Sequence, residues 1–421
     1  MQSQSTNDQG AVLIQVAVAL LALLALSAFV VDYGVMWASR GQAQTAADAG
    51  ALAGALSLAF DSPTDQAGAR ATAIAMAGRN RVWGAAPSVT DPDVTFPVCP
   101  PGAPGLPDTC VKVEVFRNQT RQNPLPMFFG RLAGIEAQGV RATATAQIMT
   151  GNATDCLKPW AVADKWEEHW ENKKASTAPW TPTSTFDKYA KDGTLDTAVT
   201  TPDVYIAPTA TSPGTGFMPF DANGNPTADY GLQIVLKIGD SKDRLSAGWF
   251  QALDLPNPDC PGGGGSLYGC NIANCNPTVY AIGETVSVSS EQGNMVGPTQ
   301  HGVEGGGQVD IGLTEKDSGA VWNTATKSIT GSCAPGICAD GNYYARSPRI
   351  VPVALFNLDA FFAGTPNGKT TITISNIMGF FVEGMSGRDV VGRLVAIPGT
   401  TKGTNTVDES ASFLRKILLV R

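Results

Sequence analysis

The hydrophobic pattern of the chain opens with one long apolar run near the N-terminus. Residues 11–31 contain no ionisable side chain, and only Gln15 and Ser27 interrupt the run with polar groups. A helix of about 20 apolar residues is long enough to cross roughly 30 Å of hydrocarbon. We therefore predict a leader over residues 1–10 and a transmembrane helix over residues 11–31, in contact with the lipid bilayer.

The helical pattern continues beyond Asp32, the residue that ends the apolar run. Residues 32–60 are rich in Ala, Leu, Gln and Met, which are good helix formers. Taken as one rod, residues 11–59 would extend roughly 70 Å at about 1.5 Å per residue. The pattern predicts a membrane anchor that continues into an alanine-rich stalk over residues 32–60.

Small residues cluster in the second half of this stalk. Gly50 and Gly54 lie one helical turn apart, among alanines such as Ala47. Such spacing lets another helix approach closely, which would allow homo-oligomerisation through the stalk. The alternative is an alanine-rich helix that packs on the chain's own C-terminal domain. Asp48 is either a charge on the helix surface or a partner for a basic residue of another subunit.

Several N-terminal motifs carry a family resemblance. They are Gly10-Ala11, the apolar run, Val31-Asp32-Tyr33-Gly34, Arg40 and the segment QTAADAGALAGA from Gln44 to Ala55. Together they resemble the N-terminal signature of the TadE/TadG-like proteins of bacterial tight-adherence (Tad, or Flp) pilus assembly systems, with Gly50 in place of one family Ala. The resemblance is confined to this N-terminal part. It implies a membrane-anchored, pilin-like or pilus-accessory protein whose partners are other pilus-assembly subunits, with no catalytic residue and no cofactor.

One departure from the prepilin pattern concerns processing. Prepilin-type signals place Gly just before the cleavage point and Glu five residues after it. Here Gln15 stands at the position of that Glu after Gly10, and no Lys or Arg precedes Gly10. This departure favours an uncleaved anchor, and cleavage after Gly10 is the alternative.

Composition narrows the class of protein further. The net charge is −8 with 16% charged residues, so the chain lacks the basic footprint of a nucleic-acid-binding protein. The 46 glycines and 28 prolines indicate many turns and a loop-rich, β-leaning body. All eight cysteines lie beyond the stalk and form an even set that suits an oxidising compartment: Cys99, Cys110, Cys156, Cys260, Cys270, Cys275, Cys333 and Cys338.

The orientation of the anchor depends on two opposing signals. Arg40 is the basic residue nearest the apolar run, and the positive-inside rule alone would place it in the cytoplasm. The cysteines and the acidic, Gly/Pro-rich body indicate the opposite arrangement. We expect a single-pass inner-membrane protein with a cytoplasmic N-terminus and a periplasmic or extracytoplasmic body.

Residues 61–150 predict a small, pilin-like α+β domain. A helix is expected over residues 61–84, with its apolar positions at Ala67, Ala71, Ile74 and Ala75. Period-2 alternation predicts strands over residues 94–98, 111–116 and 139–148, and a short helix is expected over residues 127–135. Cys99 and Cys110 flank a turn-rich connection, so we expect a disulfide that clamps a hairpin; two buried thiols are the alternative.

Residues 151–229 read as a Trp- and Thr/Pro-rich connecting region. The spacing of Trp166 and Trp170 among glutamates indicates a short amphipathic helix. A satellite core under the following loops explains these tryptophans better than a sugar-binding platform, because buried aromatic residues are the commoner case.

Residues 230–421 predict a β-rich extracytoplasmic domain, a sandwich or a barrel with long insertions. The strands are expected at residues 232–238, 284–289, 350–356, 370–374, 378–384, 390–397 and 414–420. Cys333 and Cys338 are close enough in sequence to pair locally, and Cys156 would pair with one of Cys260, Cys270 and Cys275. The cysteine spacings and the presence of only His169 and His301 argue against zinc.

Motifs for catalysis are weak throughout. Residues 221–225 imitate the start of a calcium loop, but Pro226 replaces the required Gly and Leu232 the bidentate Glu, which leaves a polar turn. The four glycines at 262–265 are not followed by Lys-Ser/Thr, and His301 has no nucleophile motif beside it. We therefore expect no enzyme and no cofactor.

The combined expectation is an α+β protein with an anchor, a stalk, a pilin-like domain and a β-rich sandwich-like domain. Its expected role is that of a minor pilin or accessory subunit in pilus biogenesis and adhesion. The alternatives are an anchored adhesion protein outside a pilus and a cell-envelope hydrolase.

Overall fold

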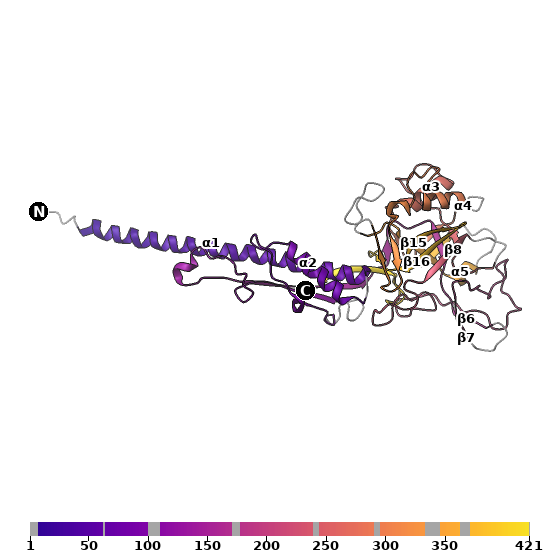
Figure 1. Ribbon diagram of the computed structural model, residues 1–421, viewed down its shortest axis with the longest axis horizontal. Coiled ribbons are helices and arrows are strands. Elements are labelled where there is room, and N and C mark those ends of the chain that lie inside the picture. Colours follow the sequence, from indigo (N-terminus) through magenta and orange to yellow (C-terminus); the bar gives the residue numbers. More distant parts are fainter. Residues whose placement is uncertain are drawn as a thin grey trace.

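The computed structural model describes residues 7–61, 64–99, 110–170, 177–238, 244–289, 295–332, 346–362 and 371–420. The molecule is elongated, with the free end of helix α1 at one pole and a β-rich body at the other (Figure 1). Helix α1 runs without a break over Asn7–Leu56 and ends in one π-helical turn, η1 (Ser57–Asp61). The prediction of one helix that joins anchor and stalk is therefore confirmed.

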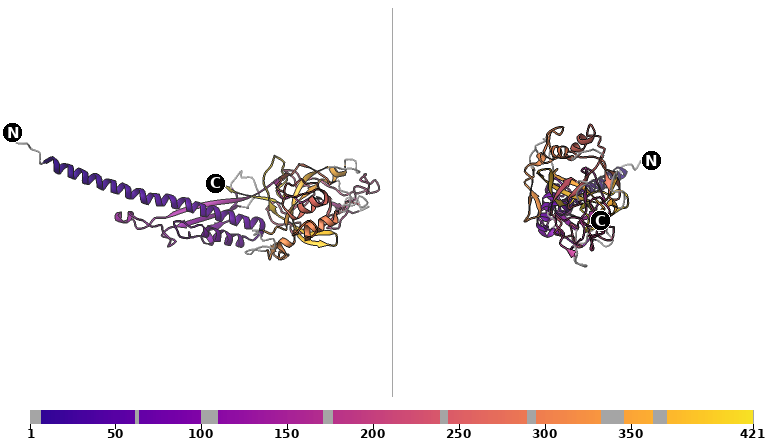
Figure 2. Two further views of the ribbon diagram at one scale, coloured as in Figure 1. Left: turned by 90° about the horizontal axis from the view of Figure 1, so that it is seen from above. Right: turned by 90° about the vertical axis from the view of Figure 1, so that its right-hand side faces the viewer.

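The two halves of α1 have different surroundings. From Val12 to Val31 the side chains are exposed, and only Ala28 is half-buried. This is the one helix in the described ranges that is long and apolar enough to cross a membrane. From Asp32 onward one face of α1 is buried against the rest of the chain. The view from above shows the free first part of α1 and the other elements alongside its later part (Figure 2).

The buried half of α1 forms a compact unit with helix α2 (Gln66–Arg79) and a five-stranded sheet. The sheet order is β1-β2-β3-β18-β17, and its strands are β1 Val94–Thr95, β2 Cys110–Arg117, β3 Val140–Thr150, β18 Leu414–Val420 and β17 Ile397–Pro398. Strands β2 and β3 are antiparallel, and the alternate valines Val111, Val113 and Val115 face the helices. Two short 3-10 helices, η2 (Asp91–Asp93) and η3 (Gly130–Ala133), lie in the connections.

Helix α2 differs from the prediction in its start and in its buried face. It begins after Asp65, whose side chain accepts a hydrogen bond from the Gly68 N–H at 2.9 Å. Its buried residues are Ala69, Ala73 and Ala77, whereas the predicted Ala67, Ala71 and Ala75 are exposed and Ile74 is half-buried. Alanine occurs on both faces of α2, so the sequence pattern does not select the buried face, and the contact with Gly50 and Gly54 places Ala73 and Ala77 against α1.

Close packing between α1, α2 and β2 depends on Gly50 and Gly54. A Cβ atom at Gly50 would lie 3.0 Å from the Ala77 Cβ and 3.1 Å from the Ala73 carbonyl oxygen. A Cβ at Gly54 would lie 2.9 Å from Val111 Cγ1. The two glycines thus let α2 and the sheet approach the backbone of α1 more closely than any larger residue would allow.

The body is built around a closed barrel. Its sheet has the order β11-β15-β14-β5-β9-β8-β16, and the additional pairing of β15 with β16 closes six of these strands into a ring. The strands are β5 Trp160–Ala163, β8 Gln233–Ile238, β9 Trp249–Ala252, β11 Thr285–Ser287, β14 Ile350–Phe356, β15 Thr371–Ser386 and β16 Asp389–Val395. Of the sandwich and barrel alternatives, the structure adopts the barrel, and the predicted segments 370–374 and 378–384 form one long strand.

Alternate side chains from all six barrel strands form one buried cluster, which includes Trp160, Phe250, Leu355 and Phe380. Helices α3 (Gly264–Ala273) and α4 (Val296–Glu304) lie together against this cluster, and the Trp160 indole donates a hydrogen bond to the Tyr268 hydroxyl at 2.9 Å. The glycine-rich sequence of this segment gave no indication of these helices. A third short helix, α5, covers Leu358–Phe362.

The remaining strands form small two-stranded ladders. They are β4 (Ala153–Thr154) with β10 (Tyr280–Ala281), β6 (Glu168–His169) with β7 (Thr177–Ala178), and β12 (Val321–Asn323) with β13 (Ser328–Thr330). A 3-10 turn, η4, covers Glu315–Asp317.

The region around Trp166 is extended, so the short helix predicted there is wrong. Glu167 forms a β-bridge with Val204, and β6 follows directly. Trp166 is buried and packs against Trp180 and Phe186 at ring distances of 5.9 and 5.3 Å. The core role preferred for this tryptophan is therefore the one observed.

The last strand returns from the body to the first unit. The sequence places β18 with the C-terminal strands, but it pairs with β3 from Arg415↔Thr150 to Val420↔Thr145. The C-terminus accordingly lies beside the α1 unit (Figure 1). At the junction, the Arg346 guanidinium lies 4.3 Å from the centre of the Phe60 ring, and that of Arg415 lies 3.9 Å from the Phe220 ring.

Three disulfides lie in the described ranges. Cys99 is bonded to Cys110, Cys156 to Cys275 and Cys260 to Cys270. The first joins the ends of the turn-rich connection before β2, and the second links the segment before β5 to the residues after α3. The predicted pair Cys333 and Cys338 lies outside the described residues.

A matched pair of glycine substitutions tests the packing of α1. Gly54→Ala should lower the free energy of unfolding by about 1–3 kcal/mol, because the added methyl group overpacks the contact with Val111 and Ala73. Gly41→Ala should raise it by up to about 1 kcal/mol, since a Cβ there meets nothing within 4 Å and alanine favours helix. Thermal unfolding of the full chain in detergent, followed by circular dichroism, measures both. Equal midpoints for the two variants would contradict the packing described.

Candidate membrane-proximal site

The most elaborate polar contact of α1 is made by Asp32, where the apolar run ends. Its carboxylate accepts backbone N–H bonds from Phe128 at 2.8 Å, Phe129 at 3.1 Å and Gly130 at 2.7 Å. The first amides of a helix have no acceptor within the helix. Asp32 therefore caps η3 from a distant part of the chain. No side chain at the start of η3 makes a capping hydrogen bond.

These bonds keep Asp32 ionised although only 7% of its surface is exposed. Burial by itself raises the pKa of the carboxyl group, but the three backbone N–H donors outweigh burial and hold the pKa below its usual value. The site thus combines a fixed negative charge with a fixed segment of backbone at the end of the apolar run.

Apolar and aromatic groups surround this carboxylate. Phe29, Tyr33 and Trp37 form a row along α1, with successive ring centres 5.9 and 6.4 Å apart. The segment that Asp32 caps brings Phe129 and Ile135 to the opposite side. Between the two lies a cavity of about 590 Å³, whose lining also includes Ala25, Ala28, Met36 and Met127.

The residues predicted for contacts between subunits lie elsewhere. Gly50, Gly54 and Ala47 are buried inside the chain, where α2 and β2 occupy the surface that another helix was expected to contact. The close-packing partners are α2 and β2 of the first unit, and not the C-terminal domain of the alternative reading. Asp48 is half-buried and accepts a hydrogen bond from the Gln44 amide at 2.8 Å.

The predicted processing residues lie in the first part of α1. Gly10 lies within the helix, which begins at Asn7, and Gln15 is exposed on the apolar span. Neither residue is near Asp32 or the glycines of the stalk in sequence, and both stay candidates for processing.

Buried ionisable groups of the body have structural partners. Asp164 is fully buried and accepts bonds from the Phe217 and Lys165 N–H groups and from the Tyr205 hydroxyl; burial raises its pKa to about 6. Burial likewise lowers the pKa of Lys158 to about 7, and its ammonium donates to the Asn271 and Asn274 carbonyls at the end of α3. Both groups fix loops and helix ends, and neither faces an open site.

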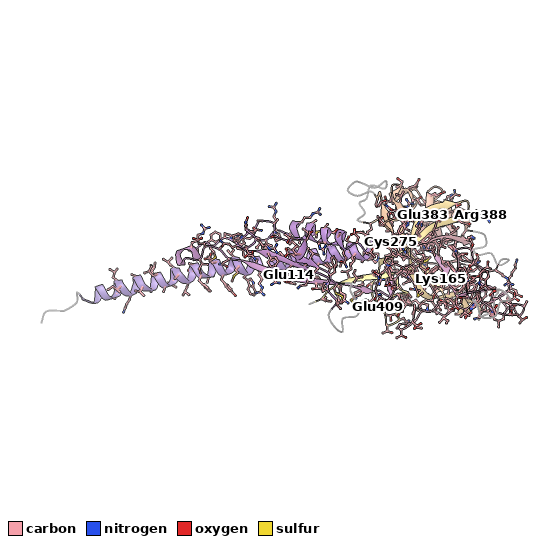
Figure 3. The ribbon with its side chains drawn as sticks, turned by 60° about the horizontal axis from the view of Figure 1, so that its bottom comes forward. Glu114, Lys165, Cys275, Glu383, Arg388 and Glu409 are labelled. Carbon is pink, nitrogen blue, oxygen red and sulfur yellow. A yellow bond between two sulfur atoms is a disulfide. The ribbon has the colours of Figure 1, made fainter. Side chains whose placement is uncertain are left out.

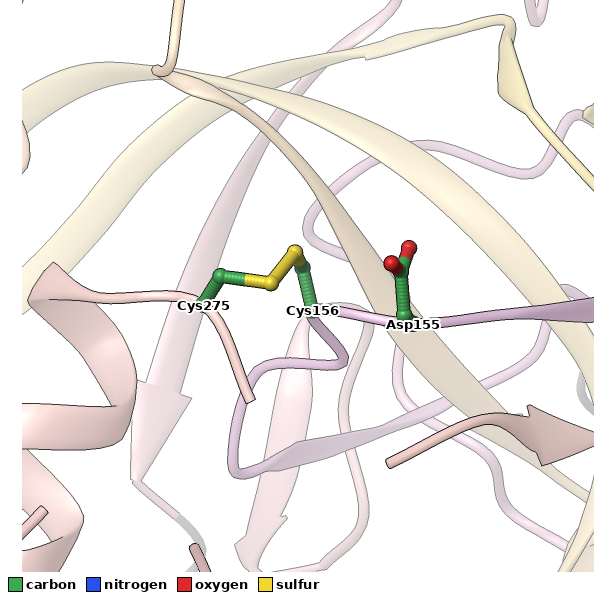
Figure 4. Close-up of side chains that lie close together, drawn as sticks. All are labelled: Asp155, Cys156 and Cys275. Atoms are coloured by element: carbon green, nitrogen blue, oxygen red, sulfur yellow. A yellow bond between two sulfur atoms is a disulfide. The ribbon is translucent and has the colours of Figure 1, made fainter. Parts of the chain in front are cut away.

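Clusters that could hold a metal are also explained by local structure. In the described ranges, Asp155, Cys156 and Cys275 form the one group with metal-ligand spacing, but the two sulfurs are bonded to each other (Figure 4). Asp221 accepts the N–H groups of Asn223 and Asn225 at 2.9 and 2.8 Å, which is the polar turn preferred over a calcium loop.

The remaining candidate chemistry is dispersed. His301, expected in a loop, is exposed on α4, and His169 lies on β6 with its Nε2 3.4 Å from Glu167. Charged side chains such as Glu114, Lys165 and Glu383 are spread over both units (Figure 3).

The capping role of Asp32 was not predicted from the sequence. Two signals could have indicated it: the place of Asp32 in the Val-Asp-x-Gly motif and the apolar segment at 127–135.

Comparison with known proteins identifies the N-terminal part. Residues 10–57 match the family model described as Tad, putative Flp pilus-assembly TadE/G-like. This confirms the resemblance to TadE/TadG-like proteins over the anchor and stalk, and relates the chain to Tad pilus systems. Neither a curated protein nor a solved structure matches the chain significantly.

Removal of the Asp32 charge should release the η3 segment. In Asp32→Asn, one carboxylate oxygen becomes an NH₂ group that faces backbone donors, so the amides of Phe128, Phe129 and Gly130 should exchange hydrogen roughly tenfold faster. Hydrogen–deuterium exchange with mass spectrometry measures this rate. Asp48→Asn on the same helix is the control and should leave these amides unchanged. Unaltered exchange in Asp32→Asn would show that the cap does not hold the segment.

Proposed function

We propose that the chain is a membrane-anchored structural or accessory subunit, similar to a minor pilin, of a Tad/Flp-type pilus assembly machine. It acts in pilus biogenesis and adhesion and not as an enzyme. The family match over residues 10–57 supports this role, since it covers the anchor together with the buried part of the stalk.

The observation that carries the proposal is that the two halves of one helix have different surroundings. The first half of α1 exposes a continuous apolar surface, and the second half is the central helix of an α+β unit. Residues 32–59 extend about 40 Å at about 1.5 Å per residue, so the barrel body is held at roughly that distance from the membrane surface. This geometry suits a subunit that positions a body above the membrane and contacts other subunits through its anchor.

The proposed location is the inner membrane, with the N-terminus in the cytoplasm and the body outside. Three disulfides in the described ranges support an oxidising compartment for the body. Because α2 and β2 of the same chain pack against the stalk glycines, contacts with pilus subunits or with a second copy would use the exposed face of α1. The anchor is proposed to remain uncleaved, since Gln15 replaces the Glu of prepilin signals.

Exchange of the anchor separates this role from that of an adhesion protein that only needs attachment. Residues 11–31 are replaced by an unrelated Leu/Ala transmembrane helix of equal length, and Asp32 and all later residues are kept. We expect the exchanged chain to remain in the membrane but to lose co-purification with the pilus-assembly subunits and to stop supporting pili in its host. Immunoblots of membrane fractions, co-purification of the assembly subunits with the tagged chain, and electron microscopy of cells provide the three readouts.

The matched control carries a conservative anchor change, Leu24→Ile, at an exposed position of the span. It should support pili like the natural chain. Full piliation with the exchanged anchor would contradict the proposed role and favour the anchored adhesion protein. A surface-binding defect on deletion of the chain, without loss of pili, would favour the same alternative.

A further inference from the structure

The segment capped by Asp32 exposes large apolar side chains beside the anchor. Phe128 is 53% exposed, Phe129 42% and Ile135 52%. Exposed apolar residues gathered in one place indicate a contact surface more strongly than scattered ones. We call residues 127–135 the interfacial loop.

The height of this loop along α1 follows from the length of the apolar run. Residues 11–31 form a helix about 30 Å long, and the hydrocarbon layer is about 30 Å thick. Asp32 therefore lies at the edge of the hydrocarbon when the apolar run spans the bilayer. Because the carboxylate of Asp32 holds three amides of the interfacial loop within 3.1 Å, the loop lies at the same edge.

The aromatic residues of α1 are placed at the same level. Tyr33 is 49% exposed and Trp37 69% exposed, and they follow the apolar run within two helical turns. Tyr and Trp are enriched at the boundary between lipid and water. The exposed charges here are Arg131 in the loop and Glu136 directly after it, one of each sign, so the attraction of the loop to a membrane would be apolar and not electrostatic.

We propose that the interfacial loop is a second membrane contact and that the cavity between it and α1 holds an acyl chain of a bilayer phospholipid. The cavity begins between Ala25 and Phe29, inside the apolar run, and extends to Met36 beyond it. Its lining is continuous with the lipid-facing surface of α1, and its volume of about 590 Å³ is adequate for an acyl chain. The proposal rests on the membrane-spanning role of α1 and not on a role in a pilus.

The consequence is a fixed tilt and depth for the anchor. A single helix is free to tilt and rotate in a bilayer unless packing or interfacial residues restrict it. Insertion of Phe128 and Phe129 beside α1 would give the protein two points of contact with one leaflet. The Asp32 cap would transmit that restriction to the stalk and the body.

The test reconstitutes the full chain in phospholipid nanodiscs that contain a phosphatidylethanolamine with a photoreactive diazirine in the middle of its acyl chain. Peptide mass spectrometry after illumination locates the lipid adducts. We expect adducts within residues 12–31 and also on the interfacial loop. The double variant Phe128→Ser and Phe129→Ser should reduce the loop adducts roughly tenfold while those on residues 12–31 stay unchanged.

Serine is used because it adds no charge that would repel Asp32. Val321→Ser is the matched control, since Val321 is 57% exposed but belongs to the body; it should not alter any adduct. Asp32→Asn should reduce the loop adducts by releasing the loop. Adducts on residues 12–31 without adducts on the loop would overturn the proposal and leave the anchor intact. Adducts on neither would overturn the anchor and the proposal together.

Discussion

The close approach of α1 to α2 and β2 at Gly50 and Gly54 is the contact on which the rest of the structure depends. At these positions a Cβ atom would lie 3.0 Å or less from Ala77 or Val111, so the two elements pack directly against the α1 backbone. This contact converts the second half of a long helix into the core of a folded unit. The first half, with no comparable partner in the described chain, is left free for lipid.

The two units are coupled at the far end of the same helix. η1 carries Phe60 to the junction, where Arg346 covers its ring, and β18 returns from the body to pair with β3. Arg415, at the start of β18, is buried and stacks on Phe220, and burial lowers its pKa to about 10, so it stays charged at neutral pH. The chain leaves the first unit after β3 and re-enters it through β18, and η1 contacts the body at the same junction, so bending between stalk and body is restricted.

The local sequence pattern predicted where helices and strands occur better than it predicted which of them pack or pair with each other. The apolar run, the alternating valines of β2 and the strand segments 350–356 and 390–397 were visible because their periodicity is local. The buried face of α2 was not, because alanine occurs on both faces and only the contact with Gly50 and Gly54 selects one. The pairing of β18 and the bonds from Asp32 to residues 128–130 join positions far apart in sequence, and the local pattern of a single sequence does not show which distant positions meet. Helix α3 starts in a run of glycines and α4 has one glycine in its first turn, and both helices pack on the barrel through Tyr268, Ile272 and Val303.

The central claim is that one helix passes from lipid to a protein core at Asp32. Single cysteines placed along α1 at positions 18, 24, 30, 34, 38 and 41, in a chain whose Cys333 and Cys338 are replaced by serine, test it through their reaction with a water-soluble maleimide in native membranes. All six positions are exposed in the isolated chain, so burial by the protein does not affect the comparison. The account predicts protection at 18, 24 and 30 and labelling at 34, 38 and 41. Uniform labelling, or protection that extends through position 41, would contradict it.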